Sequence, residues 1–206
     1  MKLDENRNTL FFNKGESVFK QGLKPAGLFA LSSGKVKNIH LNESGGTHLI
    51  NLNKPVDFLG FSDFISDQLH SYSCIAIENC SVCFIPAEDL YGVLKSNPAL
   101  SFKSLQYISN EFRAYRTRKS NLLGKNMRGR MADTLLYIYH FFNVQKQADF
   151  LDLDLTREDY GSLAQMNTAN SIRTLSEFSK RRLIRFEGHV LYYLNVKGLQ
   201  QISLTE

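Results

Sequence analysis

Apolar and polar positions follow different periods in the two halves of this chain. Between residues 10 and 85 they form short strand-like runs, such as LFALSSG, KVKNIHL and THLINL. Glycines separate these runs, at positions 15, 22, 27, 34, 45, 46 and 60. Short strands with turns at this spacing are typical of an all-β barrel or sandwich, so the first half predicts a β domain.

Residues 42 to 46 form the clearest hairpin turn of this region. If the turn is symmetric about Ser44, His40 and His48 face each other across the two strands. Two imidazoles could take part in a metal site, but a cupin-like site needs a third histidine or a carboxylate, and no HxH pattern occurs. An exposed pair without a metal is therefore the favoured interpretation, and the metal site is the alternative.

A short helix is predicted around residues 86 to 98, and a long helix begins at Pro98. The apolar positions of the long helix keep the spacing of a coiled-coil seam, with Lys119 among them. The seam residues are Leu105, Ile108, Phe112, Tyr115 and Leu122. Pairing across a two-fold axis would make a homodimer, whereas packing on the chain's own β domain is the alternative.

Gly124 and Asn126 interrupt the helical pattern, and Asn126 can cap the helix that follows. Residues 124 to 126 are therefore the predicted hinge. The flanks of the hinge are basic, with Arg113, Arg116, Arg118, Lys119, Lys125, Arg128 and Arg130.

Residues 156 to 178 predict two short helices joined by a tight polar turn. Thr156 can cap the first helix, and Asn167 or Thr168 the second. Ile172, Leu175 and Phe178 supply the apolar stripe of the second helix. Its opposite face carries Thr168, Ala169, Asn170 and Arg173, where Asn can bind adenine and Arg can bind guanine. This pattern favours a helix-turn-helix, and an ordinary helical hairpin with a solvated polar face is the alternative.

A basic cluster and a hairpin follow the second helix. Lys180, Arg181, Arg182 and Arg185 precede an alternating segment, IRFEGHVLYYL, that turns around Glu187 and Gly188. A helix-turn-helix with such a hairpin is a winged helix, so the cluster would border a DNA groove and hold phosphates. The predicted DNA-binding residues are Thr156, Asn167, Thr168, Ala169, Asn170, Arg173, Lys180, Arg181 and Arg182.

The composition agrees with two small domains of different charge. The chain has 206 residues, of which 43% are hydrophobic and 22% charged. Residues 1 to 100 carry 9 Lys and Arg against 10 Asp and Glu, and the remaining residues carry 16 against 10. A basic second half indicates a polyanion-binding domain. Because no apolar run approaches about 20 residues and the N-terminus lacks a signal-peptide core, a cytoplasmic protein without membrane contact is expected.

Three cysteines, Cys74, Cys80 and Cys83, lie in a strand-like region. The separation of three residues between Cys80 and Cys83 puts their sulfurs on opposite faces of a strand, which disfavours a shared metal. Buried structural thiols are therefore favoured, with redox sensing as the alternative.

The run FNKGESVFKQGLKPAGLFALSSGKVKNIHL and the later GGTHLINLNKPVDFLGFSDF resemble the cyclic-nucleotide-binding β-roll of the CRP/FNR superfamily of bacterial transcription regulators. The resemblance continues through the long helix, GRMADTLLYI at residues 129 to 138 and the winged helix. The residues that match the β-roll are Gly15, Glu16, Phe19, Gly22, Gly34, Val36, Gly46, Asp57, Phe58 and Gly60.

This resemblance implies an α+β fold with an N-terminal double-stranded β-helix (β-roll), a long dimerisation helix and a C-terminal winged helix-turn-helix. The three parts would span residues 1–97, 98–124 and 125–206. It implies a transcription regulator and not an enzyme.

The positions that match the effector pocket depart from the cyclic-AMP sensors of the family. Where those sensors have a Gly-Glu pair for the ribose and an Arg-Ser pair for the phosphate, this chain has Gly60 with Phe61 and His70 with Ser71. Loss of a bidentate Arg removes the strongest contact to a phosphodiester. The expected pocket residues are Gly60, Phe61, Ser62, His70, Ser71, Tyr115 and Arg116. Cyclic AMP is therefore a poor candidate, and no cofactor is expected; an iron–sulfur cluster is also disfavoured, because the branch that binds one uses four cysteines.

In the helix-turn-helix, Thr168 and Ala169 replace the Arg-Glu pair of many relatives, whereas Arg173 remains. The predicted function is binding of a pseudo-palindromic operator by a homodimer, with Arg173 giving specificity and the basic cluster giving affinity. RNA polymerase is a further expected partner. The alternatives are a regulator whose β-roll is only a scaffold, a metal-binding or haem-type sensor, and a β-barrel metalloenzyme with a DNA-binding tail.

Overall fold

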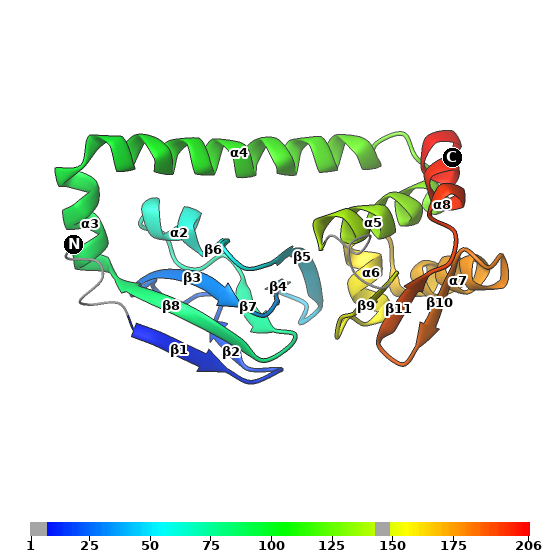
Figure 1. The fold of residues 1–206 in the computed structure, drawn as a ribbon, viewed down its shortest axis with the longest axis horizontal. Helices are drawn as coiled ribbons and strands as arrows, with labels where there is room; N and C mark the ends of the chain where they lie inside the picture. The colour runs from blue at the N-terminus through cyan, green and yellow to red at the C-terminus, as the bar shows by residue number, and fades with distance from the viewer. Residues whose placement is uncertain (1–7, 143–148) are drawn as a thin grey trace. The chain divides into compact units, whose positions relative to one another are not determined.

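The computed structural model describes residues 8–142 and 149–206 (Figure 1). The chain forms two compact units, Met1–Tyr115 and Arg116–Glu206. Within the described ranges, no helix is both long enough and apolar enough to cross a membrane.

The first unit contains two four-stranded sheets whose neighbouring strands are antiparallel. One sheet has the order β1 (Asn8–Phe12), β8 (Cys80–Pro86), β3 (Gly27–Ser33) and β6 (Phe58–Leu59). The other has the order β2 (Ser17–Phe19), β7 (Ser73–Ala76), β4 (Val36–Leu41) and β5 (Thr47–Asn53). Side chains of both sheets meet in one core cluster that includes Phe19, Leu31, Val36, Cys74 and Val82. The prediction of a β domain is confirmed.

The predicted turn between β4 and β5 is also confirmed. The amide of Gly45 donates to the carbonyl of Asn42 over 3.0 Å, and Gly45 has a φ of 83°. The side chain of Asn42 accepts the amide of Gly46 over 2.7 Å, which closes the turn on itself. His40 and His48 are partners in the register of the two strands, as a turn symmetric about Ser44 requires.

In the described part of the first unit, three helices occur or begin: α2 (Phe61–Ile65), α3 (Ala87–Ser96) and α4 (Pro98–Leu122). A second apolar cluster joins α2, α3 and the β-roll through Leu28, Phe61, Phe64 and Leu90. Tyr107 and Ile108 of α4 pack against this cluster. The hydroxyl of Tyr107 also accepts the amide of Phe58 over 3.1 Å. The first half of α4 is thus docked on the chain's own β-roll.

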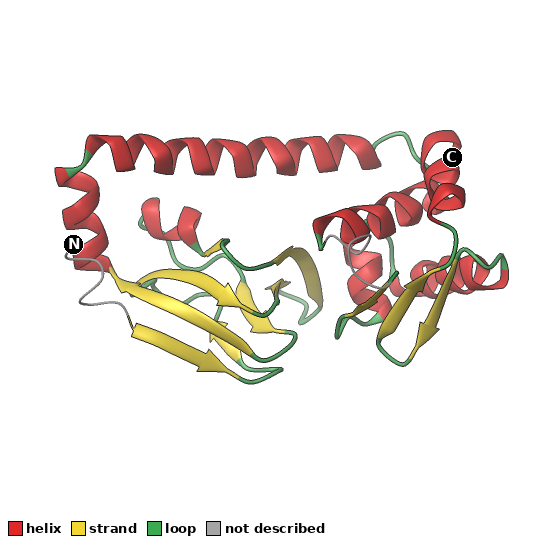
Figure 2. Ribbon diagram, in the orientation of Figure 1, coloured by secondary structure: helices red, strands yellow, loops and turns green. Residues whose placement is uncertain are grey.

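Within residues 116–142 and 149–206, the second unit combines the end of α4 and four further helices with a three-stranded antiparallel sheet, coloured by type in Figure 2. Its helices are α5 (Met127–Phe141), α6 (Arg157–Leu163), α7 (Thr168–Lys180) and α8 (Val196–Thr205). Its sheet has the order β10 (Ile184–Glu187), β11 (Val190–Tyr193) and β9 (Phe150–Asp152). The hairpin of β10 and β11 turns at Gly188, which has a φ of 59°, as predicted.

Candidate functional site

The start of α6 is fixed by a capping box. The Thr156 hydroxyl accepts the amide of Asp159 over 3.1 Å, and the Asp159 carboxylate accepts the amide of Thr156 over 2.9 Å. Two helix-terminal amides are thereby satisfied, which confirms Thr156 as the cap. The same bonds commit the Thr156 side chain to α6, so its hydroxyl is already in use at the site where a DNA contact was predicted.

The start of α7 is fixed in the same way by Asn167, whose side chain accepts the amide of Asn170 over 2.9 Å. Behind this turn, α6 and α7 approach each other closely at Gly161. A Cβ at that position would lie 3.0 Å from both the Met166 carbonyl oxygen and the Ser171 Cβ. The Ser171 hydroxyl donates to the Arg157 carbonyl oxygen and joins the two helices. The pair is a tightly packed helix-turn-helix.

One prediction about α7 is wrong by a single position. Ile172 was expected in the buried stripe, but 48% of its surface is exposed. The buried residues of α7 are Ser171, Thr174, Leu175 and Phe178. Ser171 is buried in place of Ile172 because the close approach at Gly161 leaves space only for small side chains. The buried Ser171 hydroxyl donates to a backbone carbonyl and is therefore not left unpaired.

The opposite face of α7 is available to solvent. Thr168, Ala169 and Arg173 are exposed there, and Asn170 is half-buried. The Arg173 guanidinium donates to the Asn170 amide oxygen over 2.9 Å. The two expected base-reading side chains therefore lie together on this face and hold each other's orientation.

The predicted basic cluster separates into different environments. Arg181 lies 3.6 Å from the Glu177 carboxylate, which also binds Arg128 at 2.9 Å. Arg185 forms an ion pair with Glu187 at 2.7 Å. Lys180 and Arg182 are exposed. The part of the cluster that was expected to hold phosphates thus includes two arginines with carboxylate partners.

Sequence reasoning missed Arg157 as a cation of this region. Its guanidinium lies over the Phe186 ring, 3.4 Å from the ring centre, and joins the start of α6 to strand β10. Burial lowers the pKa of Arg157, although an arginine remains charged at any ordinary pH. The sequence signal for this cation was its position directly after the Thr156 cap, because the first turn of a helix-turn-helix faces the phosphates.

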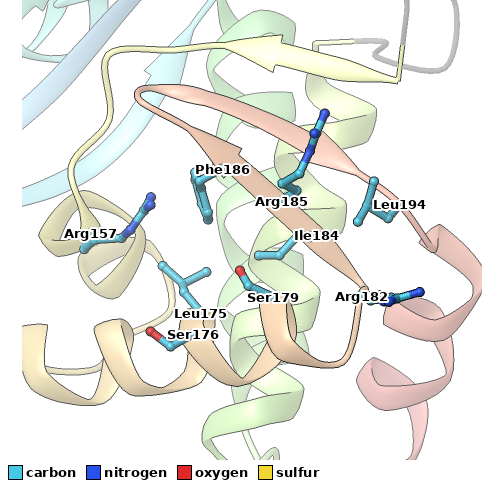
Figure 3. A pocket seen from close by; sticks show the side chains of 9 residues that line it. All are labelled: Arg157, Leu175, Ser176, Ser179, Arg182, Ile184, Arg185, Phe186 and Leu194. Carbon is cyan, nitrogen blue, oxygen red and sulfur yellow. The ribbon is translucent and has the colours of Figure 1, made fainter.

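A pocket of about 500 Å³ lies between α7 and β10 (Figure 3). Its lining combines three arginines and two serines with an apolar floor. The residues are Arg157, Leu175, Ser176, Ser179, Arg182, Ile184, Arg185, Phe186 and Leu194.

In the first unit, three residues of the expected effector region, Gly60, Phe61 and His70, are buried. Gly60 adopts a φ of 72°, and a Cβ there would meet the His70 ring at 2.8 Å. The His70 ring stacks on Phe19 with 3.9 Å between ring centres, and only 3% of the residue is exposed. Burial lowers the pKa of His70, while the nearby Asp63 carboxylate acts in the opposite direction. His70 is thus a core histidine.

Asp63 is the residue of this region that sequence reasoning missed. Its carboxylate accepts bonds from the amide and the hydroxyl of Ser71, both at 3.0 Å, and lies 3.8 Å from Nδ1 of His70. Asp63 is 8% exposed. A buried carboxylate is therefore bonded to Ser71, which the resemblance matches to the phosphate site, and a carboxylate repels an anion.

Phe61 takes the place of the ribose-binding carboxylate and is 6% exposed. It packs on Phe58 and Tyr107, with 5.6 and 5.9 Å between ring centres. The remaining expected pocket residues, Ser62, Ser71, Tyr115 and Arg116, are exposed.

The residues of the predicted dimer seam differ in how much of their surface is exposed. Leu105, Phe112 and Tyr115 are exposed by 62%, 58% and 58%. Ile108 packs on the first unit's own apolar cluster, and Leu122 is only 5% exposed. Leu122 is therefore covered within the single chain, and Ile108 is half-buried against its own unit.

The two cysteines of strand β8 differ in burial, as expected for residues three positions apart on a strand. Cys80 belongs to the buried core, whereas Cys83 on the same strand is half-buried. Burial raises the pKa of the Cys74 and Cys80 thiols. Nδ1 of His40 contacts the Ser71 carbonyl oxygen at 3.1 Å. Across residues 8–142 and 149–206, His, Cys, Asp and Glu side chains nowhere gather in threes that could hold a metal ion.

Two family models match the two units. The cyclic nucleotide-binding domain matches residues 9–97, and the Crp-like helix-turn-helix domain matches residues 129–202. Electron transport regulator A of Shewanella oneidensis is 30% identical over 191 residues, covering 92% of this chain and 76% of the relative. The chain belongs to the CRP/FNR family of transcription regulators. Its members are regulators and not enzymes, so the metalloenzyme alternative is set aside.

Other relatives within the CRP/FNR family agree with this assignment. The fumarate and nitrate reduction regulatory protein of Vibrio cholerae is 27% identical over 194 residues, covering 92% of this chain and 76% of the relative. The structure of FixK2 from Bradyrhizobium japonicum has a TM-score of 0.78 and 20% identity, covering 95% of this chain and 96% of that chain. The latter similarity confirms the α+β fold with its N-terminal β domain, long helix and winged helix-turn-helix.

Proposed function

We propose that this CRP/FNR-type regulator works in the cytoplasm as a homodimer that binds a pseudo-palindromic operator through α7. The observation that carries the proposal is the exposed face of α7, where Asn170 and Arg173 lie together in a helix that is capped and packed against α6. A dimer would present two such helices about 34 Å apart, one turn of DNA.

Base reading is assigned to Arg173 and Asn170. Arg can bind guanine and Asn can bind adenine, each through two hydrogen bonds in the major groove. Their mutual bond orients Arg173 before DNA arrives and reduces the conformational entropy that binding must remove. Thr168 and Ala169 are small and exposed, so the helix start can approach the base edges closely. The N-termini of α6 and α7 follow Thr156 and Asn167, and the positive end of each helix dipole there favours phosphates.

Dimerisation is assigned to the exposed stripe of α4. Phe102 is 61% exposed and extends the stripe formed by Leu105, Phe112 and Tyr115. The 3- and 7-residue steps from Phe102 to Tyr115 are those of a helical seam. This revised seam replaces Ile108 and Leu122. Phe112→Glu would put a charge into the seam, so sedimentation should show a folded monomer. This variant should also bind the operator far more weakly in a DNA-binding assay.

The effector, if one acts, is expected to differ from cyclic AMP. Phe61 and His70 occupy space that a nucleotide would need, and Asp63 would repel a cyclic phosphate. We propose that the β-roll either binds an effector of other chemistry or serves as a scaffold without a ligand. Contact with RNA polymerase is likewise an expectation that follows from the family.

The base-reading assignment is tested by comparing Arg173→Ala with Lys180→Ala on selected operator DNA and on scrambled DNA at one salt concentration. Arg173→Ala should lose about 1–3 kcal/mol on the operator, roughly 5- to 150-fold, with little loss on scrambled DNA. Lys180 is exposed at the end of α7, so its substitution should weaken both DNAs to the same degree. Equal losses on both DNAs for Arg173→Ala would refute the assignment.

A further inference from the structure

The pocket between α7 and β10, called the wing pocket below, has the size of a small-molecule site, about 500 Å³. Its floor is apolar and is formed by Leu175, Ile184 and Phe186, and Leu194 continues the apolar surface at one side (Figure 3). Leu175 and Ile184 are buried, whereas Phe186 is half-buried and Leu194 is 50% exposed. The last two side chains therefore leave apolar surface that a ligand can cover.

The arginines of the wing pocket differ in how free they are to bind an anion. Arg185 forms an ion pair with Glu187 at 2.7 Å. Arg157 lies over Phe186 and Arg182 is exposed, and neither has a carboxylate partner in the part of the chain that the structure describes. The positive charge left for a ligand therefore comes from Arg157 and Arg182.

Arg182 has both polar and apolar neighbours at its end of the wing pocket. Its amide donates to the Ser179 carbonyl oxygen over 3.0 Å, which places these two residues side by side. The amide of Leu194 donates to the carbonyl oxygen of Leu183, the residue after Arg182, over 3.0 Å. A guanidinium, a hydroxyl and an exposed leucine therefore lie near one another at this end, and Figure 3 shows Arg157 at the other.

These features favour a ligand with an anionic head and an apolar body. A carboxylate can accept two hydrogen bonds from one guanidinium and a further one from a hydroxyl. A hydrocarbon chain can then cover Phe186 and Leu194, and affinity grows with the apolar area that it covers. Inorganic phosphate has the charge without the chain, and a neutral alcohol has the chain without the charge. An acyl carboxylate of medium length has both.

We propose that the wing pocket binds a small acyl carboxylate, with the carboxylate on Arg182 and the Ser179 hydroxyl and the acyl chain along Phe186 and Leu194. Arg157 adds positive potential from the far end of the pocket. Because the wing pocket belongs to the second unit, this ligand site is separate from the β-roll and is present even where the β-roll is only a scaffold.

The consequence of an occupied wing pocket for DNA binding rests on the proposed function. Ser176, which lines the pocket, follows Ile172 and Arg173 by four and three residues, so the three lie on one side of α7. All three are exposed. Arg182 is also among the residues expected to bind DNA. A ligand that takes up Arg182 and covers the neighbouring surface of α7 therefore competes with operator DNA.

Titration of the full-length chain with octanoate in the absence of DNA tests the site directly. Octanoate should bind at least about tenfold more tightly than acetate, which lacks the chain, and than 1-octanol, which lacks the charge. The amide NMR signals that shift should include those of Ser179, Arg182 and Leu194. Octanoate that binds no more tightly than acetate, or shifts confined to the first unit, would overturn the proposal.

Two variants test the two halves of the ligand, with thermal unfolding as the check of folding. Leu194→Ser should weaken octanoate binding about fivefold, because it removes apolar surface only. Arg182→Gln should weaken octanoate binding about tenfold, because it removes a charged donor. Leu204→Ser is the matched control, since Leu204 is 86% exposed on α8 and does not line the wing pocket. Equal affinities for octanoate in Leu194→Ser and Leu204→Ser would contradict the proposed site.

Competition is measured through the dissociation constant for operator DNA at fixed ionic strength. Saturating octanoate should raise this constant at least about tenfold in the wild type, because the ligand and DNA exclude each other. Without octanoate, Leu194→Ser should bind DNA as the wild type does, since the substitution changes no charge. In its presence, Leu194→Ser should need about fivefold more octanoate for the same effect.

Failure of this inference and failure of the proposed function are distinguishable. A chain that selects an operator but does not bind octanoate refutes only the ligand site. A chain that binds octanoate in the wing pocket but selects no operator supports the site and refutes operator reading. Octanoate that binds there without changing operator affinity refutes the competition. Tripolyphosphate that binds more tightly than octanoate would assign the pocket to phosphates and refute the acyl carboxylate.

Discussion

The guanidinium of Arg118, near the end of α4, donates a hydrogen bond over 3.3 Å to the carbonyl oxygen of Leu163, the last residue of α6. The guanidinium also lies over the Tyr137 ring of α5, 4.0 Å from its centre. Arg130 donates to the next turn of the chain, at the Gln165 carbonyl oxygen, over 2.8 Å. Two cations therefore satisfy carbonyls at the negative end of α6, and one of them belongs to the long helix.

Similar contacts hold the segment that was predicted to be a hinge. Lys125, in the segment predicted to flex, binds the Asp133 carboxylate at 2.7 Å and the Ser203 hydroxyl at 2.9 Å. Asn126 caps α5 through the amides of Arg128 and Gly129. The end of α4 and residues 125–126 are therefore both fixed to the second unit, which opposes bending at the predicted hinge.

Arg118→Met should destabilise the second unit by about 1.5–3 kcal/mol, because it removes a charged donor from a carbonyl that is then left without its partner. Chemical denaturation followed at this unit measures the change. Arg113→Met is the control, because Arg113 lies on the same helix but is exposed, and its effect should stay within about 0.5 kcal/mol. Equal effects of the two substitutions would show that Arg118 does not hold the helix-turn-helix.

Val56→Gly should stabilise the first unit. Val56 is 84% exposed and adopts a φ of 82°, in a turn where the Asp57 amide donates to the Lys54 carbonyl over 3.1 Å. A branched residue in this region costs about 1–2 kcal/mol, whereas glycine adopts it freely. Glycine also adds flexibility to the unfolded chain, which offsets part of this gain. A net increase of about 1 kcal/mol in the free energy of unfolding is therefore expected from denaturant unfolding. Val56→Ala retains most of the strain and should gain less; a loss of stability in Val56→Gly would contradict this account.

Gly161→Ala should destabilise the helix-turn-helix, since the new Cβ would lie 3.0 Å from the Ser171 Cβ and the Met166 carbonyl oxygen. Overpacking of this kind typically costs about 1–3 kcal/mol. Gly92→Ala in α3 is the matched control, because its new Cβ meets no atom within 4 Å, and it should gain about 0.5–1 kcal/mol as alanine favours the helix. Thermal unfolding of both variants gives the comparison, and the same sign for both would argue against the close approach.

Acidification should destabilise the first unit through His70. Burial lowers the pKa of His70 below its ordinary value of 6.5, so between the two values the unfolded chain binds the proton more readily. The contribution of neutral His70 to the free energy of unfolding is fully present above pH 6.5. It is lost as the pH falls toward the pKa of His70 in the folded state, by at most about 1.4 kcal/mol per pH unit. His70→Phe keeps a ring against Phe19 and should show a shallower fall in unfolding free energy between about pH 7.5 and 5.5. An identical fall in wild type and variant would exclude this role.

Local sequence rules predicted the parts of the fold that depend on neighbours in the chain. The turn at residues 42 to 46 and the caps at Thr156 and Asn167 follow from side chains that bond to nearby backbone. The hairpin at Gly188 follows from a backbone conformation that glycine adopts easily. Strand β9 and helix α8 were not predicted. Strand β9 has only three residues and is paired solely by tertiary contact with β11, which a local pattern cannot show.

The functional residues were harder to predict, because their roles depend on distant partners. Ile108 and Leu122 satisfy the seam spacing, yet packing within the chain buries Leu122 and covers part of Ile108. Ile172 is apolar but exposed, while Ser171 is polar but buried, because Gly161 brings α6 close. Asp63 acts on His70 and Ser71, seven and eight residues away, and no local signal connects a carboxylate to that pair.

The most direct test of the central claim is selection of DNA from a random library by the purified full-length chain at fixed salt, with and without cell extract. The account predicts enrichment of one inverted repeat whose half-sites are centred about one helical turn apart. Enrichment without extract would indicate a constitutively competent reader, and enrichment only with extract would indicate a β-roll that senses a ligand. Absence of an enriched motif under both conditions, or enrichment of an isolated half-site, would contradict operator binding by a homodimer.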